Sequence, residues 1–230
     1  MGVEVAPLRL AIVEDENLYR ELLVTCLEQD RALEVVGSYA HTDSALAGIL
    51  SLTPDAVILD IDLPGSMNGV ELGLRLRRSL PSLGIVLLSN HSMPQLLGSL
   101  PAETVGGWSY LLKKSVADLP ALTRAIHGAV GGMVTVDASF VTGMRAREGA
   151  RLEQLTQRQR EVLELLAQGY TNSAIAGVLV LTEKAVEKHV SSLYEELGID
   201  RQDASLQPRV QAVLTYLRET QLQRSSVPVR

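Results

Sequence analysis

Four short apolar runs in the first half of the chain each end at a residue that can take part in chemistry. The residues that follow these runs are Glu14-Asp15-Glu16, Asp60, Ser89 and Lys113. Short apolar runs separated by helix-length segments are typical of buried strands in a parallel sheet, and functional groups gather at the carboxyl ends of such strands. We therefore expect carboxylates, a hydroxyl and an ammonium at one rim of a sheet, a set that suits a divalent cation and a phosphoryl group.

The segment from residue 8 to residue 128 alternates strand-like and helix-like stretches, and we assign it to the first domain. Strands are predicted at Leu8–Val13, Glu34–Tyr39, Ala56–Leu59, Gly84–Leu88 and Trp108–Leu112. Helices are predicted near residues 16–29, 43–52, 69–79, 93–100 and 118–127, and the glycine-rich stretch that begins at Gly128 is expected to break the last one. Five βα units in one compact module predict a right-handed α/β fold.

The chain changes character after this domain. Residues 129–151 are expected to form a linker that contains a short helix over Ala138–Met144, capped by Asp137, followed by a polar stretch from Arg145. Residues 152–218 show only helical periods, so we predict a second, all-α domain over residues 152–220 with no further strands. Its four helices are expected near residues 156–168, 172–179, 182–197 and 208–218, and the polar tail from Gln221 is expected to fray.

The composition indicates a soluble, folded protein. The 230 residues are 46% hydrophobic and 21% charged, and the one cysteine, Cys26, lies in an apolar stretch, where we expect a small buried side chain. No apolar run approaches the roughly 20 residues of a membrane span, and the N-terminus lacks the pattern of a signal peptide, so we expect a cytoplasmic location. Residues 1–150 hold 11 Lys and Arg against 17 Asp and Glu, whereas residues 151–230 hold 10 of each. A neutral second domain is only a weak indication of nucleic-acid binding.

The first domain is similar to a known family. Four segments resemble, in order, the receiver domain of two-component response regulators: Ile12-Val13-Glu14-Asp15-Glu16, Leu59-Asp60-Ile61-Asp62-Leu63-Pro64 with Gly69, Leu88-Ser89, and Tyr110-Leu111-Leu112-Lys113. The resemblance implies a flavodoxin-like sheet of strand order 2-1-3-4-5. It also implies that Asp60 is the phosphoacceptor, which forms an aspartyl-phosphate as the nucleophile.

The same resemblance implies a role for the other residues of the rim. Mg²⁺ would be bound by the carboxylates of Asp15 and Asp60, by the backbone carbonyl of Asp62 and, through a water molecule, by Glu14. The remaining residues act on the phosphoryl group: Lys113 would offset its charge, Ser89 would hydrogen-bond to it, and Tyr110 would serve as the switch aromatic.

Other interpretations of these residues remain open from the sequence. Glu14 and Asp15 could simply open the following helix, where acids favour the helix dipole. Ser89 could cap the helix predicted from residue 93, and Tyr110 could be a surface residue. Three features depart from the family pattern: one extra residue in the loop between Pro64 and Gly69, Asn90 after the switch hydroxyl, and Ser109 in place of a glycine.

The second domain is also similar to a known family. Residues 155–198 resemble the LuxR-type helix-turn-helix domain, so the whole chain resembles a response regulator of the NarL/FixJ type. The helix from Glu183 to Leu197 would be the recognition helix in the major groove of DNA. Its outward residues, which we expect to contact DNA, are Lys184, Glu187, Lys188 and Ser191. Glu187 stands where a lysine is frequent, and it could either read a cytosine or limit non-specific binding.

Together the two resemblances predict a transcription regulator and not an enzyme. A sensor histidine kinase would phosphorylate Asp60, and phosphorylation would control homodimerisation and sequence-specific binding to double-stranded DNA. One alternative is a receiver adaptor that acts through protein contacts, which the acidic recognition helix would favour. A flavodoxin-type cofactor carrier is a poorer match, because Glu14-Asp15-Glu16 repels a phosphate unless a cation is present.

Overall fold

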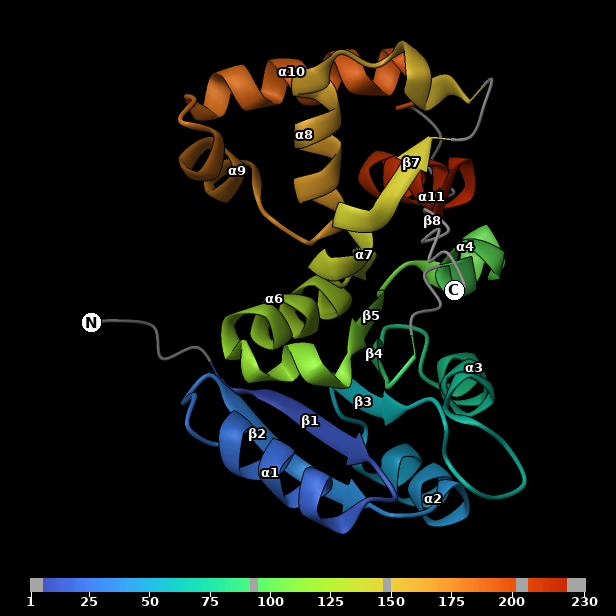
Figure 1. The fold of residues 1–230 in the computed structure, drawn as a ribbon. Coiled ribbons are helices and arrows are strands. Elements are labelled where there is room, and N and C mark those ends of the chain that lie inside the picture. The colour runs from blue at the N-terminus through green and yellow to red at the C-terminus, as the bar shows by residue number, and fades with distance from the viewer. Residues whose placement is uncertain (1–5, 92–94, 147–149, 202–206, 223–230) are drawn as a thin grey trace, which may run out of the picture. The chain divides into compact units, whose positions relative to one another are not determined.

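The computed structural model describes residues 6–91, 95–146, 150–201 and 207–222 (Figure 1). The chain divides into two compact units. The first comprises Met1–Ser92 and Thr104–Val134, and the second comprises Met93–Glu103 and Thr135–Arg230. Within the described ranges, no helix has the length and apolar character needed to cross a membrane.

A parallel sheet forms the centre of the first unit. Its strands are β1 (Leu8–Val13), β2 (Leu33–Tyr39), β3 (Ala56–Asp60), β4 (Gly84–Ser89) and β5 (Trp108–Leu112). They are parallel and lie in the order β2-β1-β3-β4-β5, which confirms the predicted topology. The sequence did not predict the two-residue strand β6 (Thr135–Val136), which belongs to the second unit.

The strand register explains why the chemical residues meet. Val13 pairs with Leu59, so Glu14 leaves β1 at the level at which Asp60 ends β3. Asp60 pairs with Leu88, and Ser89 pairs with Leu112, the residue before Lys113. The carboxyl ends of four strands therefore form one rim.

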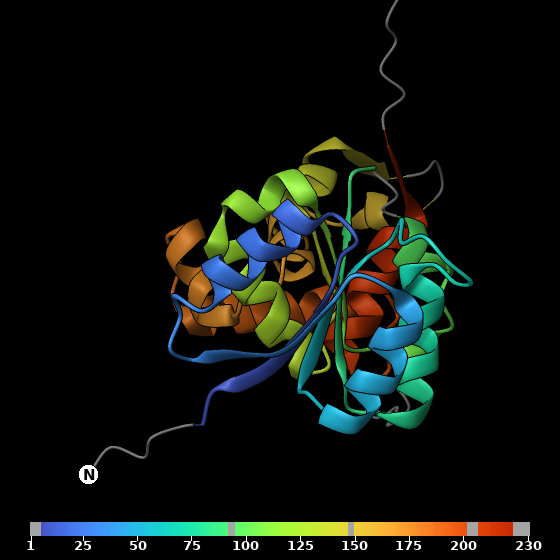
Figure 2. The ribbon, with the colours of Figure 1, turned by 90° about the horizontal axis from the view of Figure 1, so that it is seen from below.

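Helices cover both faces of this sheet (Figure 2). The helices α1 (Asn17–Leu27) and α6 (Leu119–Val130) lie on one face, and α2 (Thr42–Leu52) and α3 (Gly69–Ser79) lie on the other. Fully buried side chains join α1 and α6 to the sheet: Leu10, Ile12, Leu23, Leu27, Val86, Leu88, Leu122 and Ile126. Burial of each large apolar side chain stabilises the fold by roughly 1.5–3 kcal/mol, which fixes the helices that flank the rim.

Two helical segments of the receiver region differ from the prediction. The glycine-rich stretch ends α6 as predicted, but the helix continues to Val130, three residues beyond the predicted end, and the chain turns at Gly132, which has a φ of 76°. A glycine inside a helix costs only about 1 kcal/mol, which the packing of this helix offsets. Between β4 and β5, the structure has two short helices, α4 (Gln95–Ser99) and α5 (Ala102–Val105), where one helix was predicted. Residues 93 and 94 of that prediction lie outside the described residues.

The second unit contains the four helices that were predicted for the second domain: α8 (Gln157–Ala167), α9 (Asn172–Leu179), α10 (Glu183–Glu196) and α11 (Pro208–Glu219). The hydroxyls of Thr156, Thr171 and Thr182 cap α8, α9 and α10, and each accepts a hydrogen bond from the backbone N–H three residues later at 3.2 Å. A short helix, α7 (Ala138–Gly143), lies in the predicted linker. Asp137 accepts a hydrogen bond from the N–H of Ser139 at its start, as expected.

A two-stranded ribbon in the second unit was not predicted. β7 (Met144–Ala146) pairs antiparallel with β8 (Thr220–Leu222), with Met144 opposite Leu222. The expectation that strands end before the second domain is therefore wrong, and so is the expectation that the tail frays at Gln221. These two strands are short and far apart in the sequence, so no local pattern reveals the pairing. Residues 223–230 lie outside the described part of the chain.

Candidate functional site

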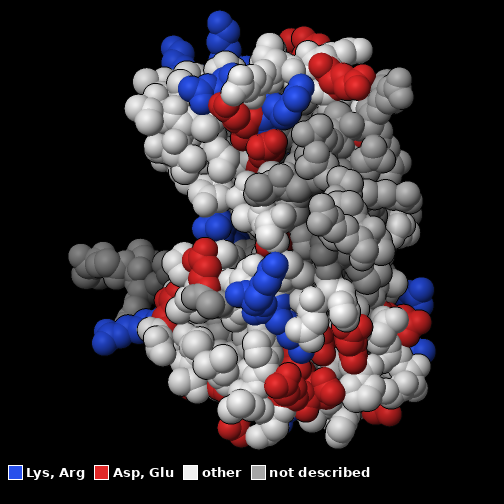
Figure 3. Space-filling model, viewed as in Figure 1, with Lys and Arg blue, Asp and Glu red and all other residues white. Residues whose placement is uncertain are grey.

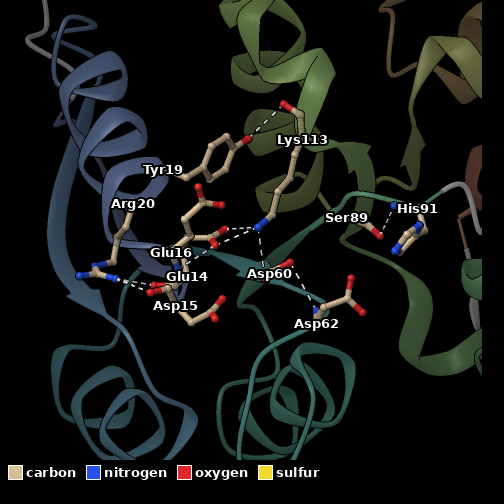
Figure 4. Close-up of polar contacts among 10 residues, drawn as sticks. All are labelled: Glu14, Asp15, Glu16, Tyr19, Arg20, Asp60, Asp62, Ser89, His91 and Lys113. Atoms are coloured by element: carbon tan, nitrogen blue, oxygen red, sulfur yellow. Dashed lines mark hydrogen bonds and ion pairs between the residues drawn. The ribbon is translucent and has the colours of Figure 1, made fainter.

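Three carboxylates converge at the rim of the sheet (Figure 4). Glu14 and Asp15 follow β1, and Asp60 is the last residue of β3. One carboxylate oxygen from each residue lies within 4.8 Å of the others. Glu14 and Asp60 are buried, whereas Asp15 is exposed to solvent. We call Glu14, Asp15, Asp60 and the nearby Lys113 the acid site.

Lys113 points its ammonium between the two buried carboxylates. Its Nζ atom lies 2.8 Å from Glu14 and 3.2 Å from the Oδ2 atom of Asp60 (Figure 4). The lysine side chain is itself only 8% exposed. Lys113 comes directly after β5, so a residue remote in sequence provides the one positive charge that these two carboxylates contact in the described structure.

Burial dominates the ionisation of the acid site. Desolvation raises the pKa of Glu14 and of Asp60, and contact with Lys113 offsets only part of this effect. For Lys113, burial alone would lower the pKa, but the hydrogen bond and charge of Glu14, together with the charge of Asp60, raise it overall. Three carboxylates thus face one ammonium, and the excess negative charge and hard oxygen donors fit Mg²⁺.

The close approach of α3 to the acid site requires a glycine. A Cβ atom at Gly69 would lie 1.9 Å from the backbone oxygen of Asp60, and the N–H of Gly69 donates to the carbonyl of Ile61 at 3.1 Å. The preceding residue, Asn68, caps α3 through a reciprocal pair of hydrogen bonds with Glu71. The loop before Asn68 therefore ends in a fixed geometry, although it is one residue longer than the family pattern.

The loop after Asp60 also orients its carboxylate. The N–H of Asp62 donates to Oδ1 of Asp60 at 3.4 Å, and the side chain of Asp62 is exposed. This leaves Oδ1 and Oδ2 of Asp60 with different partners, the backbone of Asp62 and the ammonium of Lys113. The role of the Asp62 carbonyl as a metal ligand stays a prediction.

The two candidate switch residues contact the same neighbour. The buried hydroxyl oxygen of Ser89 accepts a hydrogen bond from the N–H of His91 at 3.0 Å, and the hydroxyl of Tyr110 donates to the carbonyl of His91 at 2.6 Å. Tyr110 is fully buried, so the surface interpretation is wrong. Ser89 is not a helix cap either, since residues 90 and 91, which directly follow it, are not helical.

The helix-opening interpretation of the first two acids is also wrong. α1 begins at Asn17 with Glu16 at its N-cap position, so neither Glu14 nor Asp15 lies in its first turn. Instead Arg20, from the first turn of α1, donates from Nη1 to the carbonyl of Glu14 at 2.6 Å and steadies the loop (Figure 4).

Sequence reasoning missed Arg20, Tyr19 and His91. Arg20 donates to a backbone carbonyl, and His91 takes part through its own backbone N–H and carbonyl. No pattern of residue types in the sequence reveals hydrogen bonds of this kind. Tyr19 lies four residues after Asp15, and this spacing was the only available signal.

The second candidate region is the outward side of α10. Lys184, Glu187 and Lys188 are exposed, and Ser191 is half-buried. The opposite side of the helix packs against α8 and α9 through the buried residues Val186, Val190 and Leu193. We call Lys184, Glu187, Lys188 and Ser191 the α10 face. The space-filling view shows basic side chains interspersed with acidic ones on this unit (Figure 3).

Neighbouring polar residues of the second unit are engaged within the fold. Ser192 accepts a hydrogen bond from the side-chain amide of Gln159 at 3.1 Å. The guanidinium of Arg209 donates to the carbonyl of Tyr170, and burial lowers its pKa. Because these polar groups are bound within the fold, we do not count Ser192 and Arg209 among the residues of the α10 face.

Family models match both parts of the chain. The response regulator receiver domain matches residues 10–127, and the luxR family of bacterial regulatory proteins matches residues 153–207. The receiver match includes all four residues of the acid site, and the luxR-family match includes the α10 face.

Individual relatives extend over nearly the whole chain. The DNA-binding transcriptional activator DevR/DosR of Mycobacterium tuberculosis is 31% identical over 228 residues, which cover 96% of this chain and 97% of the relative. The response regulator protein VraR of Staphylococcus aureus is 29% identical over 90% of this chain and 95% of its own. A solved structure of two RcsB dimers bound to two parallel DNAs has a TM-score of 0.50 at 22% identity, covers 93% of this chain and 98% of that chain, and supports the fold alone. The chain belongs to the response regulators that join a receiver domain to a LuxR-type helix-turn-helix domain.

Proposed function

We propose that Asp60 accepts a phosphoryl group from a sensor histidine kinase, and that this modification controls DNA binding by the α10 face and thereby transcription. One observation carries the proposal. The ammonium of Lys113 lies 3.2 Å from Asp60 and 2.8 Å from Glu14, at a rim that also presents Asp15. This arrangement brings together a nucleophile, Asp60, an ammonium that can stabilise the charge on a phosphoryl group, and carboxylates that can bind a metal ion.

The chemistry follows from the position of each group. A carboxylate oxygen of Asp60 attacks the phosphorus of a phosphohistidine; the new O–P bond forms as the P–N bond breaks, and the histidine nitrogen keeps the electron pair. When bound by Asp15, Asp60, the carbonyl of Asp62 and, through water, Glu14, Mg²⁺ supplies positive charge to the phosphoryl oxygens. Lys113 stabilises the charge that develops on the same group.

The hydrogen bonds of His91 support a route from phosphorylation to the surface. The Ser89 hydroxyl is now bound to the N–H of His91, whose carbonyl is bound to Tyr110. If Ser89 turns to a phosphoryl oxygen, His91 loses one partner, and the segment that holds Tyr110 changes with it. We propose that this change favours a homodimer.

Dimerisation would offset the weak basicity of the second unit. In a dimer, two copies of α10 reach successive half-sites about one helical turn apart in the major groove. The second copy then binds the same DNA molecule at high effective concentration. This arrangement gives a mixed-charge α10 face enough affinity without a continuous basic surface.

The alternatives are less well supported. The luxR-family match over residues 153–207 does not favour an adaptor that lacks DNA binding. The carboxylates at the first loop do not favour a flavin carrier, because they would repel its phosphate. A cytoplasmic transcription regulator remains the proposed role.

The central residue can be tested by substitution. Asp60→Asn should abolish phosphate uptake from acetyl phosphate and Mg²⁺, measured on the intact full-length protein by mass spectrometry. Asp62→Asn is the matched control, because the proposed ligand at residue 62 is its backbone carbonyl and its side chain is exposed. Full incorporation into Asp60→Asn would contradict the assignment of the phosphoacceptor.

A further inference from the structure

Tyr19 contacts Lys113 at both ends of the lysine. Its hydroxyl donates to the backbone carbonyl of Lys113 at 3.1 Å, and the Nζ atom of Lys113 lies 5.0 Å from the centre of the tyrosine ring. Tyr19 projects from α1, whereas Lys113 follows β5, so the contact joins the two sides of the acid site (Figure 4). The tyrosine is half-buried and the lysine side chain is 8% exposed.

The tyrosine ring attracts the ammonium in a different way from the carboxylates. A ring face attracts a cation electrostatically but offers it no carboxylate-like charge and no metal ligand. Glu14 and Asp60 hold the ammonium at 2.8 and 3.2 Å, but both are also expected to serve the metal site. Tyr19 also contacts Lys113, and it is neither a proposed metal ligand nor the proposed phosphoacceptor.

We infer that Tyr19 is a positioning residue that holds Lys113 over the acid site, so that its ammonium meets the phosphoryl group on Asp60. This inference rests on the proposed function and deepens it. The hydroxyl of Tyr19 fixes the backbone of Lys113, and the ring fixes the ammonium. Tyr19 therefore acts on phosphorylation only through Lys113.

Two substitutions separate the ring from the hydroxyl. Tyr19→Phe keeps the ring and removes the hydrogen bond, whereas Tyr19→Leu removes both. With acetyl phosphate and Mg²⁺, Tyr19→Leu should lower the maximal phosphorylation rate of the full-length protein by about three- to tenfold, with a smaller loss for Tyr19→Phe and little change in the half-saturating acetyl phosphate concentration. Leu18→Ala is the matched control, because Leu18 is next to Tyr19 on α1 and 76% exposed.

A double-mutant cycle separates positioning from general support of the fold. In a Lys113→Ala background, Tyr19→Leu should cause no further loss of rate. An equal loss with and without Lys113 would overturn the inference, since Tyr19 would then act through the fold. If the wild-type protein takes up no phosphate at all, the proposed function itself is contradicted. If the protein is phosphorylated but the effects of the two substitutions are additive, only the inference about Tyr19 is contradicted.

A structural readout needs no phosphorylation. In the phosphate-free protein, the NMR signals of the Lys113 ε-methylene protons should show an upfield ring-current shift. This shift should persist in Tyr19→Phe and disappear in Tyr19→Leu. Its absence from the wild-type protein would overturn the inference, because the ring would then not lie against the ammonium.

Discussion

The acid site and the α10 face present charge in opposite ways. In the acid site, Glu14 and Asp60 are at most 3% exposed, and Lys113 contacts both at defined distances. On the α10 face, Lys184, Glu187 and Lys188 are exposed, and for none of them does the structure resolve an ion pair among the described residues. The charged groups of the acid site therefore have fixed partners, whereas those of the α10 face are exposed to solvent.

This difference decides how specific an inference each region supports. Buried charges are costly unless they are paired, so their arrangement constrains the chemistry strongly. Exposed charges contribute little to stability, and many arrangements of them are compatible with the same fold. The geometry of the acid site therefore supports a proposed role for each single residue, whereas the α10 face is a candidate surface whose residues must be ranked by experiment.

The largest expected effect in this comparison comes from Lys113. Lys113→Ala should lower the phosphorylation rate by about a hundredfold, because it removes the fixed charge that is proposed to meet the phosphoryl group. Binding of Mg²⁺, measured by titration calorimetry, should survive, since lysine is not a metal ligand. Lys114→Ala is the control, because Lys114 is adjacent and exposed. If Lys114→Ala causes the damage and Lys113→Ala has no effect, the acid site has been assigned to the wrong lysine.

An intermediate effect is expected on the α10 face. Lys188→Ala should weaken binding to cognate DNA by roughly 1–3 kcal/mol, measured by gel shift on a fragment selected from a random pool. Glu187→Gln should strengthen binding to cognate and scrambled DNA alike if Glu187 only repels phosphates. If it reads a cytosine, the same change should weaken only the cognate site by roughly 1–3 kcal/mol. We expect the first outcome, because Lys184 and Lys188 flank Glu187.

The control for these variants lies on the same helix. Glu195→Gln removes an exposed acid near the C-terminal end of α10, away from the N-terminal residues that contact bases in such domains. It should leave both DNA affinities nearly unchanged. If Glu187→Gln and Lys188→Ala are equally without effect, α10 does not enter the groove, and the adaptor alternative gains support.

The smallest expected effect concerns the turn before α10. Val180 has a φ of 54° and is 91% exposed, so it adopts a left-handed conformation without burying its side chain. A β-branched residue is strained there, whereas asparagine tolerates it. Val180→Asn should raise the free energy of unfolding by about 1 kcal/mol, measured by urea denaturation. Val178→Asn, at an exposed position inside α9, should give no such gain; equal gains would show that surface polarity, not backbone strain, is responsible.

The sequence predicted the sheet and the convergence of the acid-site residues at one rim, because both depend on local patterns. Each strand is a short apolar run, and the parallel order places Glu14, Asp60, Ser89 and Lys113 at one rim. Ser109, a departure from the family pattern, is explained by the structure: it is fully buried, and its hydroxyl donates to the carbonyl of Ala125 at 3.0 Å.

What the sequence could not predict depends on contacts between distant segments. The β7–β8 ribbon joins Met144 to Leu222, and neither strand has a pattern of its own. Tyr19 became a candidate only when the fold placed its ring against Lys113. The predicted helix ends were also imprecise. For example, α6 continues through Gly128, because packing outweighs the weak unfavourable effect of a single glycine on helix stability.

The most direct test of the account is DNA binding by the full-length protein with and without acetyl phosphate and Mg²⁺. Affinity for a selected DNA fragment should be measured by fluorescence anisotropy, at one fixed salt concentration, for the wild-type protein and for Asp60→Asn. We predict that the phosphodonor strengthens binding by the wild-type protein by at least about tenfold and leaves Asp60→Asn unchanged. Equal affinity of the wild-type protein with and without the phosphodonor, or an equal gain in Asp60→Asn, would contradict the claim that phosphorylation of Asp60 controls the α10 face.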